Sequence, residues 1–351
     1  MIHQRPDISQ LPTYVQGRSV PNAVKLSSNE NPYPPLDSVR ERVAAELTRF
    51  NLYPDIAATA LVSRIADRYG VRPEQIALGA GSVEVLGQLL HASAGVGDEV
   101  IFAWRSFEAY PILTQIAGAT AVRVPLTADE RHDLPAMARA ITDRTRLILV
   151  CSPNNPTGGT VLADELDAFM ATVPPEVLVV FDEAYAHFNT LPGAADGLDF
   201  FRRYDNVAVL HTFSKAYGLA GLRVGYAIAP EPVAQNLRRV AVPFGVSNLA
   251  QVGAIASLDA EDELRARIDV IVAERARVTE ALRAAGWRVL DSTGNFVWLR
   301  TGDRTPELDA ALQDHGVVVR AYGSEGLRVT IGDRDMNDRF LSAMRGLDPV
   351  R

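Results

Sequence analysis

Two lysines are the first candidates for chemistry in this 351-residue sequence, because a lysine amine can act as a nucleophile. Of the 35 basic residues, only Lys25 and Lys215 are lysine, and all others are arginine. An arginine guanidinium stays protonated in proteins and cannot form a Schiff base with an aldehyde. Codon bias alone could also leave two lysines, so the neighbours of each must distinguish amine chemistry from chance. Lys25 has no suitable neighbours, and chance is sufficient to explain it.

The neighbours of Lys215 favour amine chemistry on a phosphorylated aldehyde. The sequence His-Thr-Phe-Ser-Lys ends at this residue and directly follows an apolar run. The hydroxyls of Thr212 and Ser214 and the guanidinium of Arg223 could surround a phosphate. The amine of Lys215 would then form an imine with the aldehyde of the same molecule.

A glycine-rich turn earlier in the chain offers further phosphate donors. Gly-Ala-Gly-Ser at 79–82 follows the apolar residues 76–78 and precedes a helix expected over 83–90. Glycines let backbone amides approach an anion, and the N-terminus of a helix adds partial positive charge. Such a turn is also common without any ligand. The turn alone therefore does not predict a phosphate site, and the prediction depends on the polar groups at the other strand ends.

Two more polar groups follow apolar runs. The segment Ser-Pro-Asn-Asn-Pro-Thr-Gly at 152–158 fixes amide groups that could recognise a ring oxygen or a carboxylate, although an Asn-Pro turn explains it equally well. Asp182 ends another run, where a buried carboxylate is costly without a cationic or hydrogen-bonding partner. A protonated pyridine nitrogen would be such a partner. The alternative is that Asp182 caps a helix.

The elements that must position these groups are the apolar runs themselves. Runs rich in β-branched residues occur at 99–103, 146–150, 177–181 and 207–210. Their lengths and spacing indicate parallel strands that are buried on both faces and joined by helices. Ligands of such open sheets bind beyond the carboxyl ends of the strands. We therefore expect an α/β doubly wound, mostly parallel sheet with the polar groups along one edge.

The rest of the chain is expected to form a smaller α+β domain and an N-terminal arm. The pattern predicts a long helix from about Val233 to Ala285 and short strands near the C-terminus, at 295–299, 317–320 and 327–330. The proline-rich N-terminus favours an extended arm. The expected division is an arm over 1–36 that joins the small domain, a large ligand-binding domain over 37–240 and a small domain over 241–351.

Composition narrows the possible partners. The formal net charge of -8 argues against nucleic acid as a partner. We expect a cytoplasmic protein, because the N-terminus lacks a signal-peptide pattern and no stretch reaches the roughly 20 apolar residues of a membrane span. Cys151 is the single cysteine and the six histidines are scattered, so neither a disulfide nor a metal site is expected. A small-molecule partner is favoured.

Taken together, these motifs resemble the fold-type I aminotransferases, in the branch that holds histidinol-phosphate and aromatic amino acid aminotransferases. The resemblance runs from Ser-Asn-Glu-Asn-Pro at 28–32 to Leu-Arg-Val-Thr at 327–330. It implies pyridoxal 5'-phosphate as cofactor, bound by the large domain as a Schiff base with Lys215, which would later move the substrate proton. Asp182 would stabilise the protonated pyridine nitrogen. Asn155 and Tyr185 would bind the ring hydroxyl oxygen.

The resemblance also implies roles for residues outside the strand ends. The phosphate would lie on the turn at Gly81 and the amides of Ser82 and Val83, beside the hydroxyls and guanidinium near the lysine. Phe107 would stack on the cofactor ring, where relatives often have tyrosine. Tyr53 would reach the phosphate from a partner subunit, which implies a homodimer with shared sites.

Substrate recognition is the last implication of the resemblance. Arg328 would clamp the substrate carboxylate, with Asn155 beside it. Val83 replaces an acidic or amide residue that is usual in histidinol-phosphate enzymes, so an apolar substrate is favoured. Tyr14 and Phe244 would line an aromatic pocket, although both could equally be packing residues. We expect transfer of an amino group from a phenylalanine-like substrate to 2-oxoglutarate, giving an aryl-pyruvate and glutamate.

Three alternatives stay open on the sequence. A histidinol-phosphate aminotransferase would need extra cations for the distal phosphate, and Arg320 is one candidate. A lyase or decarboxylase could use the same cofactor and scaffold. A cofactor-sensing domain of a transcription regulator is disfavoured by the short arm and the acidic charge.

Overall fold

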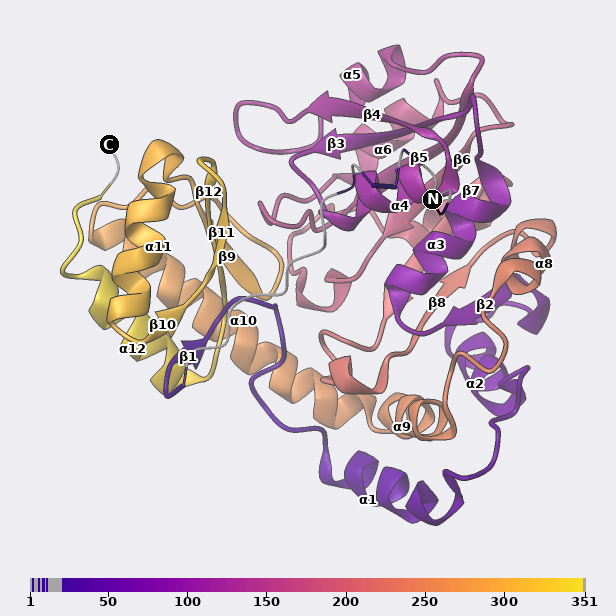
Figure 1. Ribbon diagram of the computed structural model, residues 1–351, viewed down its shortest axis with the longest axis horizontal. Coiled ribbons are helices and arrows are strands. Elements are labelled where there is room, and N and C mark those ends of the chain that lie inside the picture. The colour runs from indigo at the N-terminus through magenta and orange to yellow at the C-terminus, as the bar shows by residue number, and fades with distance from the viewer. Residues whose placement is uncertain (1, 3–5, 7, 10, 12–20, 350–351) are drawn as a thin grey trace.

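The main feature of the structure, a computed structural model that describes residues 21–349 and residues 2, 6, 8, 9 and 11, is a seven-stranded sheet (Figure 1). Its strand order is β2-β8-β7-β6-β5-β3-β4. Strand β8 runs antiparallel to both neighbours, and the other neighbouring pairs are parallel. The strands are β2 (Ile76–Gly79), β3 (Glu99–Trp104), β4 (Thr120–Pro125), β5 (Thr145–Cys151), β6 (Leu178–Asp182), β7 (Val207–Thr212) and β8 (Gly225–Ile228).

Both faces of the central strands of this sheet are buried, which explains why those strands are continuously apolar. In β5, Leu147 and Leu149 belong to one apolar cluster, whereas Ile148 and Val150 belong to the other. Alternate residues of a strand point to opposite faces, so each run fills two cores. The four apolar runs that predicted strands are confirmed as β3, β5, β6 and β7, and the α/β doubly wound class is confirmed with them.

Helices cover the two faces. The cluster of Leu147 contains residues of α3 (Ser82–Ser93), α4 (Ala109–Ala117) and α8 (Glu231–Val240). The cluster of Ile148 contains residues of α2 (Thr59–Tyr69), α5 (Leu134–Arg139), α6 (Ala163–Met170) and α7 (Gly197–Arg203). Short 3-10 turns are η1 (Leu47–Arg49), η2 (Pro73–Gln75), η3 (Ala186–Phe188), η4 (Ala220–Leu222) and η5 (Gly302–Arg304).

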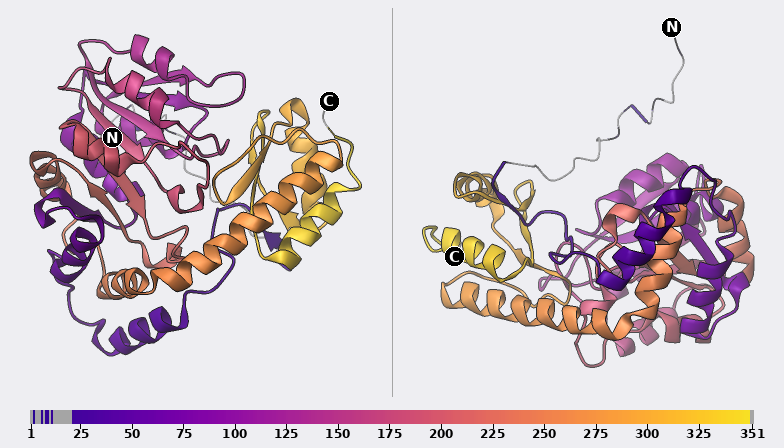
Figure 2. Two further views of the ribbon diagram at one scale, coloured as in Figure 1. Left: turned by 180° about the vertical axis from the view of Figure 1, so that it is seen from behind. Right: turned by 90° about the horizontal axis from the view of Figure 1, so that it is seen from below.

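A second, smaller assembly contains the C-terminal strands (Figure 2). Strands β11 (Arg320–Tyr322), β12 (Gly326–Thr330) and β9 (Phe296–Leu299) form an antiparallel sheet in that order. Helices α11 (Thr305–Asp314) and α12 (Arg334–Met344) pack beside it, and α10 (Glu261–Ala284) connects it to the large sheet (Figure 2). The run expected as one strand at 317–320 is divided between β10 (Val317–Val318) and β11.

The prediction of one helix from Val233 to Ala285 is wrong. The structure has three helices there, namely α8, α9 (Asn248–Asp259) and α10. The loop between α8 and α9 contains Pro243, and Phe244 adopts a left-handed backbone with φ of 58°. The Ser247 hydroxyl then caps α9 by accepting a hydrogen bond from the Ala250 amide at 3.2 Å. Helix α9 lies after residue 240, in the segment expected to belong to the small domain, but it packs against α2 and α1 (Asp37–Glu46) of the expected large domain. The domain division at residue 240 therefore remains a proposal.

The described part of the N-terminal arm is extended but packed. Strand β1 (Val24–Lys25) pairs in parallel with β10, and the Leu26 amide donates to the Val318 carbonyl at 2.7 Å. Leu26 is buried. This pairing directs residues 27–30 toward the space between the two sheets, where Ser27, Ser28 and Glu30 line the cavity described below. Among the described residues, no helix combines the length and apolar character that a membrane span requires.

Candidate active site

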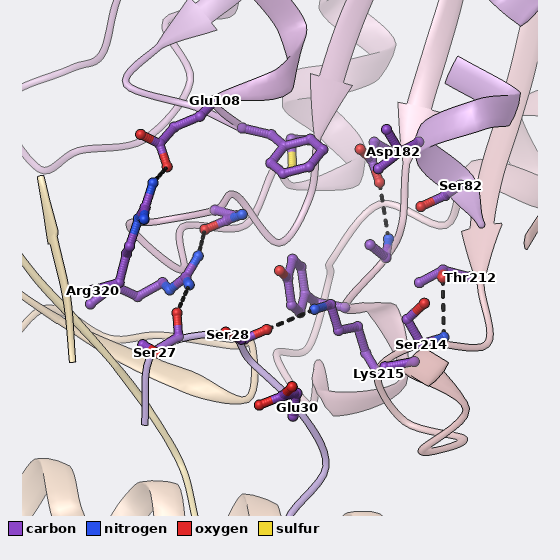
Figure 3. A pocket seen from close by; sticks show the side chains of 18 of the residues that line it. Ser27, Ser28, Glu30, Ser82, Glu108, Asp182, Thr212, Ser214, Lys215 and Arg320 are labelled. Atoms are coloured by element: carbon purple, nitrogen blue, oxygen red, sulfur yellow. Dashed lines mark hydrogen bonds and ion pairs between the residues drawn. The ribbon is translucent and has the colours of Figure 1, made fainter. Parts of the chain in front are cut away.

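A cavity of about 640 Å³ lies at the carboxyl ends of the parallel strands (Figure 3). Cys151, Asp182 and Thr212 are the last residues of β5, β6 and β7, and all three line it. The sequence-predicted residues that line this cavity are Ser82, Val83, Phe107, Asn155, Asp182, Tyr185, Thr212, Ser214, Lys215, Arg223 and Arg328. The expectation that polar groups from separate strand ends converge is therefore met by the fold.

Lys215 lies in the middle of these groups with its amine partly deprotonated near neutral pH. Nζ donates a hydrogen bond to the Ser28 carbonyl oxygen at 3.1 Å (Figure 3). Burial lowers the pKa of Lys215 to about 7, and the positive charge of Arg328 contributes in the same direction. A neutral amine is the form that attacks an aldehyde. The other lysine, Lys25, instead forms an ion pair with Glu30 at 2.8 Å.

Asp182 is buried behind the lysine and is held by neutral donors. The Tyr110 hydroxyl donates to Oδ2 at 2.7 Å, and the Ala184 amide donates to Oδ1 at 3.2 Å. Burial raises the pKa of Asp182, while the bond from Tyr110 opposes the rise. Within the described residues, Asp182 forms no ion pair with a basic side chain. A cationic ligand group would therefore lower the cost of keeping this carboxylate charged.

Arg328 contributes a guanidinium from the small sheet. It lies on β12 and is buried. Nη1 donates to Asn155 Oδ1 at 2.6 Å and to the Tyr322 hydroxyl at 3.0 Å, and Nη2 donates to the Ser27 carbonyl at 2.6 Å. Nε is buried without a partner in the described structure. An unpaired buried donor is costly, and a carboxylate ligand would satisfy it.

Tyr185 lies above the lysine and is fixed by the arm. Its ring centroid is 5.9 Å from Lys215 Nζ, and its hydroxyl accepts a hydrogen bond from Asn29 Nδ2 at 3.0 Å. Burial raises the pKa of Tyr185, so its hydroxyl stays protonated and can donate to a ligand oxygen. Asn29 is itself bonded to Thr330. The arm, the large sheet and the small sheet thus meet around this phenol.

The opposite end of the cavity has the donor set of an anion site. Ser82 begins the twelve-residue helix α3, and Gly81 before it has a φ of 85°. Residues with a side chain rarely adopt this φ, and a Cβ at Gly81 would also displace the Arg223 guanidinium, so glycine is favoured there. Arg223 Nη1 lies 3.4 Å from Ser214 Oγ, and Thr212 Oγ1 accepts from the Ser214 amide at 3.1 Å. Hydroxyls, a cation and a helix N-terminus therefore surround one point.

Of the predicted residues that the structure describes, Gly81, Tyr53 and Phe244 are not among those that line this cavity, although Gly81 directly precedes the lining residue Ser82. The Tyr53 side chain is 81% exposed, and Phe244 is 43% exposed. Their ring centroids are 4.6 Å apart, so the two side chains contact each other. Tyr14 lies outside the described residues. Phe107 does line the cavity, where its edge meets the Tyr110 ring at 5.6 Å between centroids.

Several cavity residues were missed by the sequence analysis. Tyr110, which does not line the cavity but hydrogen-bonds to Asp182, was missed too; it lies three residues beyond Phe107, and that spacing was the available signal. Ser28 and Glu30 belong to a segment that was recognised as an arm without a role for its side chains. Glu108 and Tyr322 gave no local signal, because their importance depends on contacts across the two sheets.

Comparisons with known proteins agree with this geometry. The family Aminotransferase class I and II matches residues 21–344. A Streptomyces coelicolor protein named aromatic amino acid aminotransferase is 58% identical over 341 residues, covering 96% of this chain and 95% of that protein. A Cutibacterium acnes protein of the same name is 56% identical over 346 residues, covering 98% of each. The structure of histidinol-phosphate aminotransferase from Sinorhizobium meliloti in complex with pyridoxal-5'-phosphate has a TM-score of 0.89 at 26% identity, covering 99% of this chain and 97% of that chain.

Proposed function

Because this chain belongs to the aminotransferase class I and II family, we propose that it transfers the amino group of an aromatic amino acid to 2-oxoglutarate with pyridoxal 5'-phosphate. The products would be an aryl-pyruvate and glutamate. The observation that carries the proposal is that one cavity contains a lysine amine with a lowered pKa, a buried carboxylate and a buried arginine, one donor of which has no partner in the part of the chain that the structure describes. These are Lys215, Asp182 and Arg328.

The donor set fits this cofactor. Its phosphate would bind at Ser82, Thr212, Ser214 and Arg223, where an anion meets a cation and a helix N-terminus. When bound, pyridoxal phosphate supplies an electron-withdrawing ring that stabilises negative charge at the substrate α-carbon. The carboxylate of Asp182 would hold the proton on the ring nitrogen.

The remaining steps belong to side chains of this protein. Lys215 would bind the cofactor covalently and then move the substrate α-proton through Nζ. Tyr185 and Asn155 would bind the ring hydroxyl oxygen, and Phe107 would pack on the ring face. Arg328 would bind and orient the substrate carboxylate through its remaining donor capacity.

An aromatic substrate is supported by the side chains of the cavity and by the names of the relatives at 50–58% identity. Val83, Phe107 and Tyr322 give the cavity apolar surface, which suits a phenyl ring. The second candidate is histidinol phosphate, and the observation that favours it is the presence of Arg320 in the same cavity. That arginine, however, is ion-paired with Glu108 at 2.8 Å.

We also propose that the active unit is a homodimer. Tyr53 and Phe244 belong to an exposed apolar edge that further contains Phe50, Leu52, Ile56 and Val242. Tyr53 contacts Phe244, and Phe244 lines one hollow with Ile56 and Val242. Grouped exposed apolar side chains of this kind are typical of protein interfaces. Tyr53 would then reach the phosphate site of the partner subunit.

The decisive experiment is a substrate panel with purified holoenzyme. Steady-state rates are measured with phenylalanine, tyrosine and histidinol phosphate at matched concentrations, with 2-oxoglutarate as acceptor. We expect the aromatic amino acids to have the higher kcat/KM and one glutamate to form per amino group transferred. A preference for histidinol phosphate contradicts the aromatic assignment, and turnover without consumption of 2-oxoglutarate contradicts transamination to that acceptor.

A further inference from the structure

Two arginine–glutamate pairs connect the segment before α4 to the β11–β12 hairpin. Glu108 Oε2 accepts from Arg320 Nη2 at 2.8 Å, and Glu325 accepts from Arg105. In the first pair the acid belongs to the segment before α4, and in the second pair it belongs to the hairpin. Glu108 and Arg320 line the cavity, whereas Arg105 and Glu325 are not among its lining residues.

Arg320 lies beside the arginine proposed to bind the substrate carboxylate. Arg320 and Arg328 are directly opposed on the antiparallel strands β11 and β12. Opposed residues of such strands project from the same face of a sheet, so both guanidinium groups face the cavity. Two adjacent cations without an acid would form a strong site for a dianion. The Glu108 carboxylate cancels one of the two charges.

The other charges of the cavity are already engaged under the proposed function. Arg223 would neutralise the cofactor phosphate, Asp182 would meet the ring nitrogen, and Lys215 would bind the cofactor. Glu30 is ion-paired with Lys25. Glu108 and Arg320 lie on the opposite side of the cavity from Thr212 and Ser214 (Figure 3), so their ion pair sets the balance of charge on that side.

We propose that Glu108 is a specificity-determining residue that excludes substrates with a doubly charged distal group. This inference rests on the proposed function and names how the cavity separates its two candidate substrates. A phenyl ring brings no charge to the Glu108–Arg320 pair. A phosphate monoester brings about two negative charges, and it meets both an occupied guanidinium and a repelling carboxylate.

The pair is sheltered enough for its charge to matter. The side chains of Arg320 and Glu108 are 17% and 28% exposed. Between partly buried unit charges a few ångströms apart, the interaction changes binding by a factor of roughly 10 to 100. Glu108 is the residue before α4 but forms no side-chain cap to that helix, so its replacement does not remove a helix cap.

The test is Glu108→Gln in the holoenzyme, with Glu325→Gln as the matched control. Both variants break an arginine–glutamate pair between the same two segments, but only Glu108→Gln changes the charge of the cavity lining. We expect Glu108→Gln to raise the ratio of kcat/KM for histidinol phosphate to kcat/KM for phenylalanine about 10- to 100-fold. The ratio of kcat/KM for 2-oxoglutarate to kcat/KM for phenylalanine should rise less, because 2-oxoglutarate carries only one distal charge. Glu325→Gln should leave both ratios within about twofold of wild type.

The outcomes separate this inference from the proposed function. An unchanged ratio in Glu108→Gln, or an equal rise in Glu325→Gln, overturns the role of Glu108, even if phenylalanine remains the preferred substrate. If wild-type enzyme does not use phenylalanine, the proposed function fails first. Should Glu108→Gln not fold, Glu108→Ala removes the same charge with a smaller side chain, and its ratio must rise in the same direction.

Discussion

Two regions differ in how completely a single chain forms them. One is the cavity floor, formed by Asp182, Lys215 and the ends of β5, β6 and β7, and the other is the exposed apolar edge around Tyr53 and Phe244. On the floor, Asp182 is buried and bonded to Tyr110, and Lys215 is bonded to the arm. On the edge, Tyr53 is 81% exposed and contacts Phe244, which is itself 43% exposed. The floor is made by ends of central strands, whose positions one sheet fixes. The edge has the character of a surface that a second chain completes.

The largest effect is expected from removing the amine of the floor. Lys215→Ala should lower kcat/KM about 10⁴-fold or more, because under the proposed function it would remove both the covalent link to the cofactor and the proton carrier. Visible absorbance of the holoenzyme in the region of a cofactor Schiff base should disappear. Lys25→Ala is the matched control, since it removes the other lysine, and it should retain both absorbance and activity. Retained absorbance in Lys215→Ala excludes this lysine as the attachment point.

A smaller loss of activity is expected from replacing Arg328, which extends from the small sheet into the cavity. Arg328→Gln should lower kcat/KM about 10²- to 10³-fold for phenylalanine and 2-oxoglutarate alike, because each carries the carboxylate that Arg328 would bind. The exposed Arg334, whose side chain is 71% exposed, provides the control Arg334→Gln. Steady-state kinetics with both substrates measures the effect. A loss confined to one substrate would show that Arg328 serves the side-chain end.

Replacing Tyr53 on the exposed apolar edge should reduce activity less, and the reduction should depend on which chain the variant pairs with in a dimer. Tyr53→Ala is expected to weaken cofactor binding about tenfold, with little change in the free energy of unfolding of the single chain, in which the residue is exposed. Mixing Tyr53→Ala chains with Lys215→Ala chains should recover activity, since mixed dimers contain one site with both side chains. If the mixture is no more active than the sum of its components, Tyr53 does not act across an interface.

The smallest effect is expected in the pH dependence of cofactor binding, which tests whether Arg328 on the small sheet influences the pKa of Lys215 beside the large sheet. Burial and Arg328 lower the pKa of Lys215 to about 7, so uptake of pyridoxal phosphate by cofactor-free protein should accelerate as pH rises through about 7. Stopped-flow absorbance measures this rate. Arg328→Gln should move the midpoint to higher pH by less than about one unit, because burial is the larger cause. A midpoint that stays in place excludes the charge of Arg328 as a contributor.

The same lowered pKa has a consequence for stability. The unfolded chain keeps the lysine proton up to about its ordinary pKa of 10.5, whereas the folded cofactor-free chain releases it near 7. Between these values the unfolded state binds more protons, so Lys215 makes the fold more stable as pH rises. Lys215→Met should remove this part of the pH dependence in denaturant unfolding.

Local patterns were sufficient where a residue's role follows from the strand before it. Asp182 and Thr212 end continuous apolar runs, so their place at the carboxyl edge could be predicted. The long helix was predicted wrongly because its apolar periodicity outweighed the break at Pro243. Arg328 was found only through resemblance, since an arginine on a short strand resembles any surface arginine. Tyr110 and Glu108 were missed because their partners lie 72 and 212 residues away.

By itself, the sequence determined the class of sheet, the amine and the groups that follow each strand, because hydrophobic periodicity and strand-end position are local properties. Only the tertiary structure decided that Ser28 contacts Lys215, that one donor of Arg328 has no partner among the described residues and that Glu108 neutralises Arg320. Each of these facts depends on the packing of the arm, the large sheet and the hairpin against one another. Contacts between distant segments set burial and charge, and these quantities cannot be read from neighbouring residues along the chain.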